Sequence, residues 1–492
     1  MSHALPLYRA DTVRALERAA AERGVDAGTL MERAGAAVAA LAMARWPAAR
    51  RVGVLCGRGN NGGDGYVAAL ALHRAGLDVH LLAAGEPTTP EAIAAARRWR
   101  EAGLPAKTFA GPDVDDPVPL PCVDLWIDAL FGVGLNRAPA DAIAQRLRDL
   151  GASGAPVLAV DVPSGVDADS GFAPGVALRA DLTLCLVAAK RGLFTASGRA
   201  FAGEVRIDAL DVPPDALAVA PVDALAVAAP ALRAALPQRN LDSHKGDHGR
   251  VLCLGGDLGM EGALVLCAEA AARTGAGSVV AWTRPGAVAA LHVRRPEVMA
   301  RAVEAAEGVA TSGASVIVVG PGLGRAAWGR ALFDAAMASD RPLVIDADAL
   351  SLLAERGSPS TDAVLTPHPG EAARLLGATT AEVQRDRFAA LDALVARYGC
   401  AVVLKGAGTL VGAPDHTPRI VQAGNPGMAT AGMGDVLAGI IAALRAQGLP
   451  AFEAAWSGAL AHAVAGDVAA ADRPRGLLAA DVLDALREAF HP

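Results

Sequence analysis

Residues 51–75 read RVGVLCGRGNNGGDGYVAALALHRA, and this stretch decides the fold of the first half of the chain. An apolar run at 51–56 is followed by a glycine-rich turn and then by residues with helical spacing. Such a turn exposes backbone N–H groups at the start of a helix, where they can bind a phosphate. The next apolar run, 78–84, ends without the acidic residue that binds ribose hydroxyls in dinucleotide folds. The pattern therefore predicts a Rossmann-like α/β domain without a standard dinucleotide site.

Two α/β patterns follow one another along the chain. In each, short runs rich in Val, Leu and Ile alternate with long Ala-rich stretches of helical spacing, which is typical of parallel sheets covered by helices on both faces. We therefore expect two three-layer α/β domains. The predicted strands are 51–56, 78–84, 123–129, 156–162 and 181–187 in the first half, and 249–256, 277–282, 315–320, 341–347, 362–367 and 400–406 in the second.

The segment 211–240 separates the two patterns. It is rich in Pro and Ala and carries no catalytic-looking cluster. We place the domain boundary near 215–225, with an N-terminal domain at 1–215 and a C-terminal domain at 222–492. The length of 492 residues agrees with at least two domains at roughly 150 residues each.

The composition excludes several classes of partner. Hydrophobic residues make up 53% of the chain and charged residues 20%, which permits a large core. The net charge of −7 and the 4% aromatic content provide neither a basic surface nor stacking rings for nucleic acid, and no basic patch for a membrane. We expect small-molecule substrates, and we expect the chain to form a homo-oligomer.

The N-terminal residues and the cysteines bear on where the protein is expected to be found. Charged residues precede any apolar run at the N-terminus, so no secretory signal is predicted, and no transmembrane segment is expected. The six scattered cysteines contain no C-x-x-C pair, and we interpret them as reduced core residues. These features predict a cytoplasmic protein.

Two aspartates of the first half stand where predicted strands end. Asp128 and Asp161 each close an apolar run, and a carboxylate is costly to bury there unless it holds a cation, a hydroxyl or a proton in transit. The simpler alternative for each is a turn or helix-capping aspartate. For the glycine turn at 57–65, the simpler alternative is a tight turn without a ligand.

The motifs GNNGGDG (59–65), DALFGVGLNR (128–137), DVPSGVD (161–167) and AAKRGL (188–193) together resemble the epimerase domain of the NAD(P)H-hydrate repair enzymes. The resemblance implies that the first domain interconverts the R and S forms of NADH or NADPH hydrated at C6 of the nicotinamide ring. It implies a K⁺ ion at Asn61, Asp128 and Ser164, and a catalytic Asp161 that also contacts the hydrate. The other implied hydrate contacts are Asn60, Asn61, Gly62, Gly63, Asp64, Gly132, Val133, Gly134, Leu135, Asn136, Arg137 and Ala138.

The second half carries its chemistry in GNPGMATAGMGDVLAG (424–439). Gly432 and Gly434 let the backbone approach an anion, and Asp435 stands at the predicted start of a helix. Phosphoryl transfer to a hydroxyl needs both an anion hole and a carboxylate that takes the hydroxyl proton. An N-capping aspartate is the simpler alternative. The chain has only four lysines, and three of them, Lys190, Lys245 and Lys405, lie in glycine-flanked motifs, which marks them as further candidates.

The motifs HKGDHG (244–249), GPGLG (320–324), TPHPGE (366–371), KGAGT (405–409) and GMATAGMGD (427–435) resemble the nucleotide-dependent NAD(P)H-hydrate dehydratases, a branch of the ribokinase-like fold. The resemblance implies ADP or ATP as co-substrate with Mg²⁺, and Asp435 as the catalytic base. It implies hydrate contacts at Ala263, Gly322, His368 and Asp435. The AMP portion of the nucleotide is expected at Lys405, Gly406, Ala407, Gly408, Thr409 and Gly434. The alternative for His368, which stands between two prolines, is that it only shapes the turn.

The two resemblances predict a bifunctional enzyme that epimerises NAD(P)H hydrates and dehydrates the S form. One alternative is a small-molecule kinase with a non-catalytic N-terminal domain, which would release a stable phosphorylated product. Another is that the first domain is a binding or scaffold module, although the joint presence of Asn61, Asp128, Asp161 and Ser164 argues against it.

Overall fold

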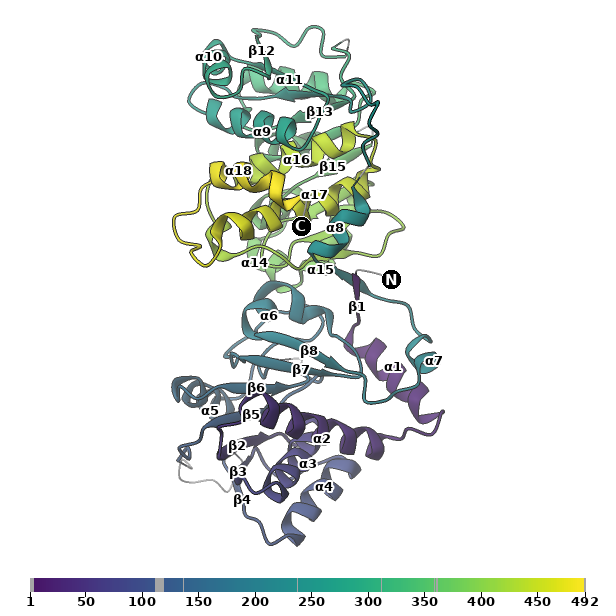
Figure 1. The fold of residues 1–492 in the computed structure, drawn as a ribbon, viewed down its shortest axis with the longest axis vertical. Helices are drawn as coiled ribbons and strands as arrows, with labels where there is room; N and C mark the ends of the chain where they lie inside the picture. Colours follow the sequence, from purple (N-terminus) through teal and green to yellow (C-terminus); the bar gives the residue numbers. More distant parts are fainter. Residues whose placement is uncertain are drawn as a thin grey trace. The chain divides into compact units, whose positions relative to one another are not determined.

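The computed structural model describes residues 4–110, 119–135, 137–236, 238–310, 312–357, 359 and 362–490. The chain divides into two compact units, which we treat separately. The first unit spans Pro6–Ala224, and the second contains Leu225 onward together with Ala4 and Leu5 (Figure 1). The division falls inside the Pro- and Ala-rich segment 211–240.

A seven-stranded parallel sheet forms the first unit (Figure 1). Its order, β4-β3-β2-β5-β6-β7-β8, reverses direction between β2 and β5. In doubly wound sheets ligands bind at the carboxyl ends of the strands beside such a reversal. The strands are β2 (Arg51–Cys56), β3 (Asp78–Ala83), β4 (Ala106–Thr108), β5 (Leu125–Ala129), β6 (Val157–Val160), β7 (Leu182–Leu186) and β8 (Glu204–Asp208).

Both faces of this sheet are covered, so the expected three-layer α/β fold is confirmed for the first unit. Alternate strand residues such as Val54 and Ile127 belong to one core with the helices α1 to α4, whereas Leu55 and Trp126 belong to a second core with α5. The helices are α1 (Ala10–Ala21), α2 (Ala27–Arg45), α3 (Asn60–Arg74), α4 (Pro90–Glu101), α5 (Asp141–Ala152), α6 (Ala196–Phe201) and α7 (Pro214–Leu217), with a 3₁₀ turn η1 (Arg191–Phe194).

The second unit contains an eleven-stranded sheet, ordered β1-β9-β18-β17-β16-β15-β14-β13-β10-β11-β12. In this sheet, the seven strands β12, β11, β10, β13, β14, β15 and β16 are mutually parallel. Strand β17 is antiparallel to both of its neighbours. The order reverses between β10 and β13. The strands are β1 (Ala4–Leu7), β9 (Ala224–Val227), β10 (Arg250–Leu254), β11 (Ser278–Thr283), β12 (Met299–Ala302), β13 (Val316–Val319), β14 (Leu343–Ile345), β15 (Ala363–Leu365), β16 (Ala401–Leu404), β17 (Leu410–Gly412) and β18 (Arg419–Val421).

Helices α9 and α16 to α18 share one core with alternate residues of this sheet, including Val251 and Val318. The intervening Leu252 and Ile317 are also fully buried, as strands covered on both faces require. The helices are α8 (Ala229–Ala235), α9 (Glu261–Arg273), α10 (Pro285–Arg294), α11 (Ala327–Met337), α12 (Ala347–Arg356), α13 (Pro369–Leu376), α14 (Thr380–Arg385), α15 (Arg387–Tyr398), α16 (Met433–Ala446), α17 (Ala451–Ala470) and α18 (Ala479–Ala489), with a 3₁₀ turn η2 (Pro426–Met428).

Every strand predicted from an apolar run is present, but the sequence patterns missed the short or polar strands β1, β4, β8, β9, β12, β17 and β18. Five cysteines are buried and free as expected, whereas Cys122 is exposed, so its assignment to the core was wrong. Among the described residues, no helix combines the length and apolar character needed to cross a membrane.

A fragment of residues 222–492 should fold on its own and melt cooperatively in a circular-dichroism experiment, because it keeps β9 and the core around α16 and α17. A matched fragment that begins at residue 229 lacks β9 and leaves the edge of β18 unpaired, so we expect it to melt at a lower temperature or to aggregate. A 222–492 fragment without a cooperative transition would contradict this division of the chain.

Candidate active sites

The glycine turn of the first unit packs directly against the end of β5. A Cβ placed on Gly57 would lie 1.9 Å from the carbonyl oxygen of Leu130, and one placed on Gly65 would lie 2.6 Å from the Cβ of Ala129. Larger residues would push the two strand ends apart. The glycines therefore bring the start of α3, at Asn60 and Asn61, to the edge of the sheet where its order reverses.

Asp128 is fully buried at the end of β5. Its Oδ1 accepts hydrogen bonds from Ser164 Oγ at 2.6 Å and from the Leu130 N–H at 3.2 Å, and its Oδ2 accepts from the Ser164 N–H at 2.8 Å. Burial raises the pKa of Asp128, and these hydrogen bonds oppose the rise. Within the described residues no basic side chain contacts this carboxylate, so the arrangement suits a bound cation.

Gly132 lies between two of the predicted site residues. A Cβ on Gly132 would lie 3.2 Å from Asn61 Oδ1 and 3.3 Å from Asp161 Oδ2. The structure thus brings Asn61, Gly132 and Asp161 together. The buried Nδ2 of Asn61 has no hydrogen-bond partner among the described residues, which leaves this amide group free to donate to a ligand.

The rest of the predicted hydrate loop is more open. Gly134, Arg137 and Ala138 are exposed, and Val133 and Leu135 are partly exposed. The remaining residue of this loop, Asn136, lies outside the described residues. On the other side of the site, Gly62, Gly63 and Asp64 are buried in the first turn of α3, whereas Asn60 is exposed.

Asp161 forms an ion pair with a buried lysine. Its Oδ1 accepts hydrogen bonds from Lys190 Nζ and from the Leu186 N–H, the latter at 3.1 Å, and the Lys190 side chain is 1% exposed. Burial acts to lower the pKa of Lys190, but the charge and hydrogen bond of Asp161, together with the charges of Cys185 and Glu17, offset this, so the pKa is raised. The backbone of Asp161 is left-handed, with φ of 68°, and the β-branched Val187 is left-handed too, with φ of 65°.

Two more carboxylates surround this pair. Burial, with further contributions from the charges of Asp161 and Glu17, raises the pKa of Asp64 well above its usual range. Burial likewise raises the pKa of Glu17, which extends from α1. The site therefore contains one carboxylate held by an ammonium and two whose pKa values are raised by burial.

In the second unit, Asp435 lies in the first turn of α16, after Gly432 in a left-handed conformation. Burial and the neighbouring charge of Asp346 raise the pKa of Asp435 to about 7, and the charge of Lys405 opposes the rise. A carboxylate with this pKa can accept a proton near neutral pH.

Asp346 and Lys405 form the second buried pair. Lys405 Nζ donates to Asp346 Oδ1 at 2.9 Å, and Thr366 Oγ1 donates to the same oxygen at 2.7 Å. Asp346 Oδ2 is buried and has no hydrogen-bond partner among the described residues. A Cβ on Gly434 would lie 3.1 Å from Lys405 Nζ and 3.5 Å from Asp346 Oδ2, so the pair faces the start of α16.

His368 caps α13. Its Nδ1 accepts hydrogen bonds from the N–H groups of Gly370 at 3.0 Å and Glu371 at 3.4 Å, and Glu371 Oε2 accepts from the His368 N–H at 2.8 Å. The turn-shaping alternative therefore has a structural basis, although the imidazole is 58% exposed and its Nε2 is 3.5 Å from Glu371 Oε1. Burial raises the pKa of Glu371 to about 7.

A buried arginine supports the predicted nucleotide loop. The Arg387 side chain donates to the carbonyl oxygens of Leu404 at 3.0 Å and of Lys405 at 3.3 Å. Within the loop, Thr409 Oγ1 donates to the Gly406 carbonyl at 3.0 Å. Gly406 has a positive φ of 142°, and Gly406 and Ala407 are exposed, so the backbone of this turn is accessible to a ligand.

The other two predicted hydrate contacts lie around one loop. Gly322 accepts a hydrogen bond from the Asp257 N–H at 2.6 Å, and Ala263 stands in the first turn of α9, where its N–H donates to Met260. A Cβ on Gly432 would lie 2.6 Å from Leu266 Cδ1 of α9. The residue that precedes α16 therefore packs against α9.

The sequence reasoning did not select Asp346, Glu371 or Glu17, and it noted Lys190 without assigning it a role. Asp346 could have been found, because it closes the apolar run 341–347 just as Asp128 and Asp161 close theirs. Lys245, by contrast, is exposed, and the structure gives it an ordinary surface position. Side chains of His, Cys, Asp and Glu do not gather in a metal-binding set of three or more anywhere in the described ranges.

Comparison with known proteins matches both units. Residues 27–192 match the family model described as YjeF-related protein N-terminus, and residues 251–488 match the model described as NAD(P)H-hydrate dehydratase. The chain is 43% identical to the bifunctional NAD(P)H-hydrate repair enzyme Nnr of Coxiella burnetii over 99% of both chains. It is 42% identical to the Escherichia coli enzyme of the same name, over 99% of this chain and 94% of that protein.

Among solved structures, the ADP/ATP-dependent NAD(P)H-hydrate dehydratase from Bacillus subtilis, co-crystallised with ATP and Mg²⁺, is 30% identical. It superimposes with a TM-score of 0.50 and covers 54% of this chain and 96% of its own. The likeness supports a ribokinase-like fold for the second unit.

Replacement of Lys190 by Met should lower the free energy of unfolding of the first unit by about 3 kcal/mol, because Asp161 would keep a buried charge without a partner. The double variant Asp161→Asn with Lys190→Met should recover part of this loss in denaturant titrations. The exposed pair Arg97–Glu101 is the control, and its disruption should cost no more than about 1 kcal/mol. Equal stability of the single and double variants would contradict the ion pair.

Proposed function

The chain belongs to the family of bifunctional NAD(P)H-hydrate repair enzymes, and we propose that it restores reduced nicotinamide cofactors in two steps. The first unit interconverts the R and S hydrates of NADH and NADPH. The second unit removes water from the S hydrate at the expense of ADP or ATP, and releases phosphate with AMP or ADP. Full-length similarity to bifunctional relatives carries this conclusion, since each unit keeps its own glycine-framed site.

The alternative of a small-molecule kinase with a non-catalytic first domain is not supported. The relatives that span both units carry the name of the repair enzyme, and the ribokinase-like neighbour with Mg²⁺ and ATP is itself named a dehydratase. A phosphorylated intermediate also explains why a dehydratase has a kinase-like site, because water is a poor leaving group and phosphate a good one.

In the first unit we assign proton transfer to Asp161. Inversion at a carbinolamine carbon requires a group that takes and returns a proton at the hydroxyl. Asp161 is held in place by Lys190 and the Leu186 N–H, and its Oδ2 faces the open position at Gly132. We assign the matching acid to Asp64, because it lines the same site and burial raises its pKa well above the usual range.

Asn61, Asp128 and Ser164 fit the K⁺ ion that the family implies. Potassium takes oxygen ligands, and Asp128 supplies buried carboxyl oxygens without a basic partner in the described residues. Bound there, the cation would supply positive charge near the hydrate. Asp128 and Ser164 themselves fix the strand ends through their mutual hydrogen bonds at 2.6 and 2.8 Å.

In the second unit we assign general-base catalysis to Asp435, with nucleotide contacts at Lys405 to Thr409 and at Gly434. Asp435 would take the proton of the ring hydroxyl as it is phosphorylated, and the N–H groups at the start of α16 would face the transferred phosphoryl group. Mg²⁺ is usually held by one or two carboxylates and the substrate phosphates, so the unpartnered Asp346 Oδ2 fits a metal that arrives with the nucleotide.

The proposal is tested by incubating the purified chain with a mixture of R and S NADH hydrate. With ADP or ATP and Mg²⁺, the absorbance of reduced nicotinamide should rise until all of the hydrate has been converted to NADH, because epimerisation supplies the S form to the second unit. Recovery that stops at the S fraction would refute the epimerase, and a stable phosphorylated product without NADH would refute the dehydratase.

The dehydratase rate should rise with pH up to about 7 and then level off, because the base Asp435 must be ionised and its pKa is about 7. The measurement is kcat/KM for the S hydrate at saturating nucleotide. Asp435→Asn should lower this rate by about 10²-fold or more while nucleotide binding persists. A rate independent of pH from about 5 to 9 would contradict the assignment.

Asp161→Asn should lower the rate of enzymatic R-to-S conversion by about 10²-fold or more, because the amide cannot take the proton. The asparagine keeps the size of the side chain but leaves the buried Lys190 without its carboxylate partner, so thermal unfolding must show that the first unit is still folded. Dehydration of the pure S hydrate by the same variant is the internal control and should match the wild type. Epimerisation at the wild-type rate would return the first unit to the binding-module alternative.

A further inference from the structure

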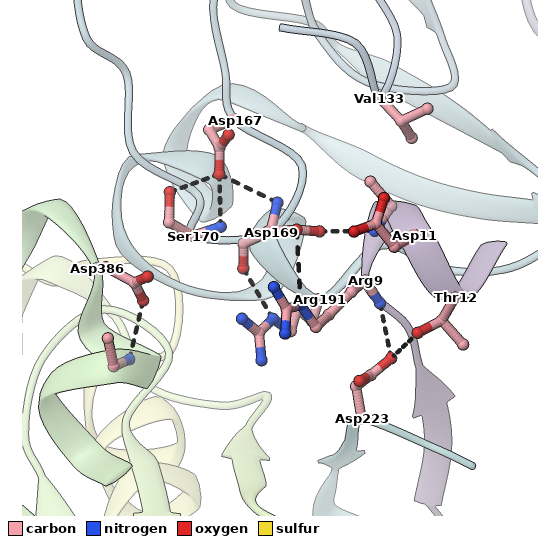
Figure 2. Close-up of polar contacts among 12 residues, drawn as sticks. Arg9, Asp11, Thr12, Val133, Asp167, Asp169, Ser170, Arg191, Asp223 and Asp386 are labelled. Atoms are coloured by element: carbon pink, nitrogen blue, oxygen red, sulfur yellow. Dashed lines mark hydrogen bonds and ion pairs between the residues drawn. The ribbon is translucent and has the colours of Figure 1, made fainter. Parts of the chain in front are cut away.

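Helix α1 lies outside residues 27–192, yet it is fastened to the first unit at its first turn. The Ala10 N–H donates to Asp169 Oδ1 at 2.6 Å. Asp223 Oδ2 accepts from the Arg9 N–H at 2.9 Å and from Thr12 Oγ1 at 2.7 Å. Figure 2 shows these two carboxylates on either side of the start of the helix. These hydrogen bonds therefore fix the position of α1 on the first unit.

The same segment touches two parts of the epimerase site. Arg14 Nη2 donates to the carbonyl oxygen of Val133 at 3.3 Å, in the loop expected to bind the hydrate. The Tyr8 N–H donates to the Ala189 carbonyl at 2.8 Å, and the Arg191 N–H donates to the Tyr8 carbonyl at 3.0 Å. These two bonds flank Lys190, the partner of Asp161.

A cavity of about 350 Å³, which we call the α1 cavity, lies between this helix and the site. One wall carries the polar side chains Arg14, Glu17 and Arg18 of α1, and Asn60 and Asp64 of α3 face the same space. Leu186 and Val187 complete it, and the Leu186 N–H also binds Asp161. The remaining lining is apolar and consists of Ala21, Ala27, Leu30, Met31, Ala34 and Leu210.

The charged side chains of α1 that line the α1 cavity differ in whether they already form hydrogen bonds or ion pairs. Arg14 binds Asp11 at 2.6 Å as well as Val133. Arg18 and Glu17 have no hydrogen bond or ion pair through their side chains among the described residues, and burial raises the pKa of Glu17. An unpaired guanidinium is suited to a phosphate, and an acidic side chain to sugar hydroxyls.

We propose that the α1 cavity binds the ribose 5-phosphate joined to the hydrated nicotinamide ring, with Arg18 pairing with the phosphate and Glu17 accepting hydrogen bonds from the ribose hydroxyls. The proposal rests on the epimerase function of the first unit. The ring then lies toward Leu186 and Asp161. A volume of about 350 Å³, near the lower end of the range for ligand pockets, is large enough for a sugar phosphate. The adenosine half lies outside, so hydrates of NADH, NADPH and the reduced mononucleotide share these contacts.

The test compares two truncated substrates: the hydrate of reduced nicotinamide mononucleotide, and the hydrate of reduced nicotinamide riboside, which lacks the phosphate. Their epimers are followed chromatographically without added nucleotide. Arg18→Ala should lower kcat/KM about tenfold or more for the mononucleotide hydrate, mainly through KM, and at most about twofold for the riboside hydrate. Arg18→Lys should restore part of the loss. Glu17→Gln should lower kcat/KM by similar factors for both substrates, because both carry the ribose.

The matched control is Arg97→Ala on α4, an arginine with 70% of its side chain exposed and no place in the α1 cavity, and it should behave as the wild type. Thermal unfolding checks that each variant is folded. Equal losses from Arg18→Ala on both substrates, or no loss on either, would overturn the phosphate contact while wild-type activity still upholds the epimerase. A wild type that epimerises none of these hydrates, NADH hydrate included, would overturn the epimerase function and this proposal with it.

Discussion

Each unit depends on a carboxylate that is buried at the carboxyl end of a parallel strand and paired with one lysine. Asp161 after β6 pairs with Lys190, and Asp346 after β14 pairs with Lys405 at 2.9 Å. A charge in such a position is costly to desolvate, so the acid requires a partner that a later part of the chain must deliver. The chain has only four lysines, and two of them serve this purpose. Arginine supplies almost all other positive charge, but a compact ammonium on a flexible stem fits a narrow, buried strand end better than a planar guanidinium.

The two sheets place these acids at equivalent positions. In each, the strand order reverses between a first strand and its crossover neighbour, β2 and β5 in one sheet, β10 and β13 in the other. The acid follows the next strand beyond that neighbour. Strained backbone accompanies both pairs, with positive φ at Asp161 and at Ala347. Surrounding packing must impose such conformations, and they recur where a side chain has to be aimed at a ligand.

The sequence predicted those parts of the fold in which apolar runs are long enough to mark strands. It missed β4, β8 and β12, because AKT, EVRID and MARA lie at or near the sheet edges and need few apolar residues. The strand-end rule found Asp128 and Asp161, and the same rule applied to 341–347 would have found Asp346. Nothing local could predict that Glu17 and Arg18 face a cavity with Asp64, because the amphipathic pattern of α1 shows which side is apolar but not what the polar side meets. Tertiary contacts decide that, as they decide which acid obtains the lysine.

The distribution of lysines among acids then sets the proton chemistry of each site. In the first unit Asp161 holds the ammonium of Lys190, whereas Asp64 forms no ion pair with any described residue and burial raises its pKa well above the usual range. The two carboxyl groups thus lie in different environments, and inversion of a carbinolamine carbon needs one group that takes a proton and one that returns it. In the second unit Asp346 holds Lys405, and Glu371 lies farther from the same ammonium, at 3.7 Å. Asp435 and Glu371 both have pKa values of about 7, so a proton is easily gained or lost there. A general base must accept the hydroxyl proton and later release it. A carboxylate with a pKa of about 7 can do both near neutral pH.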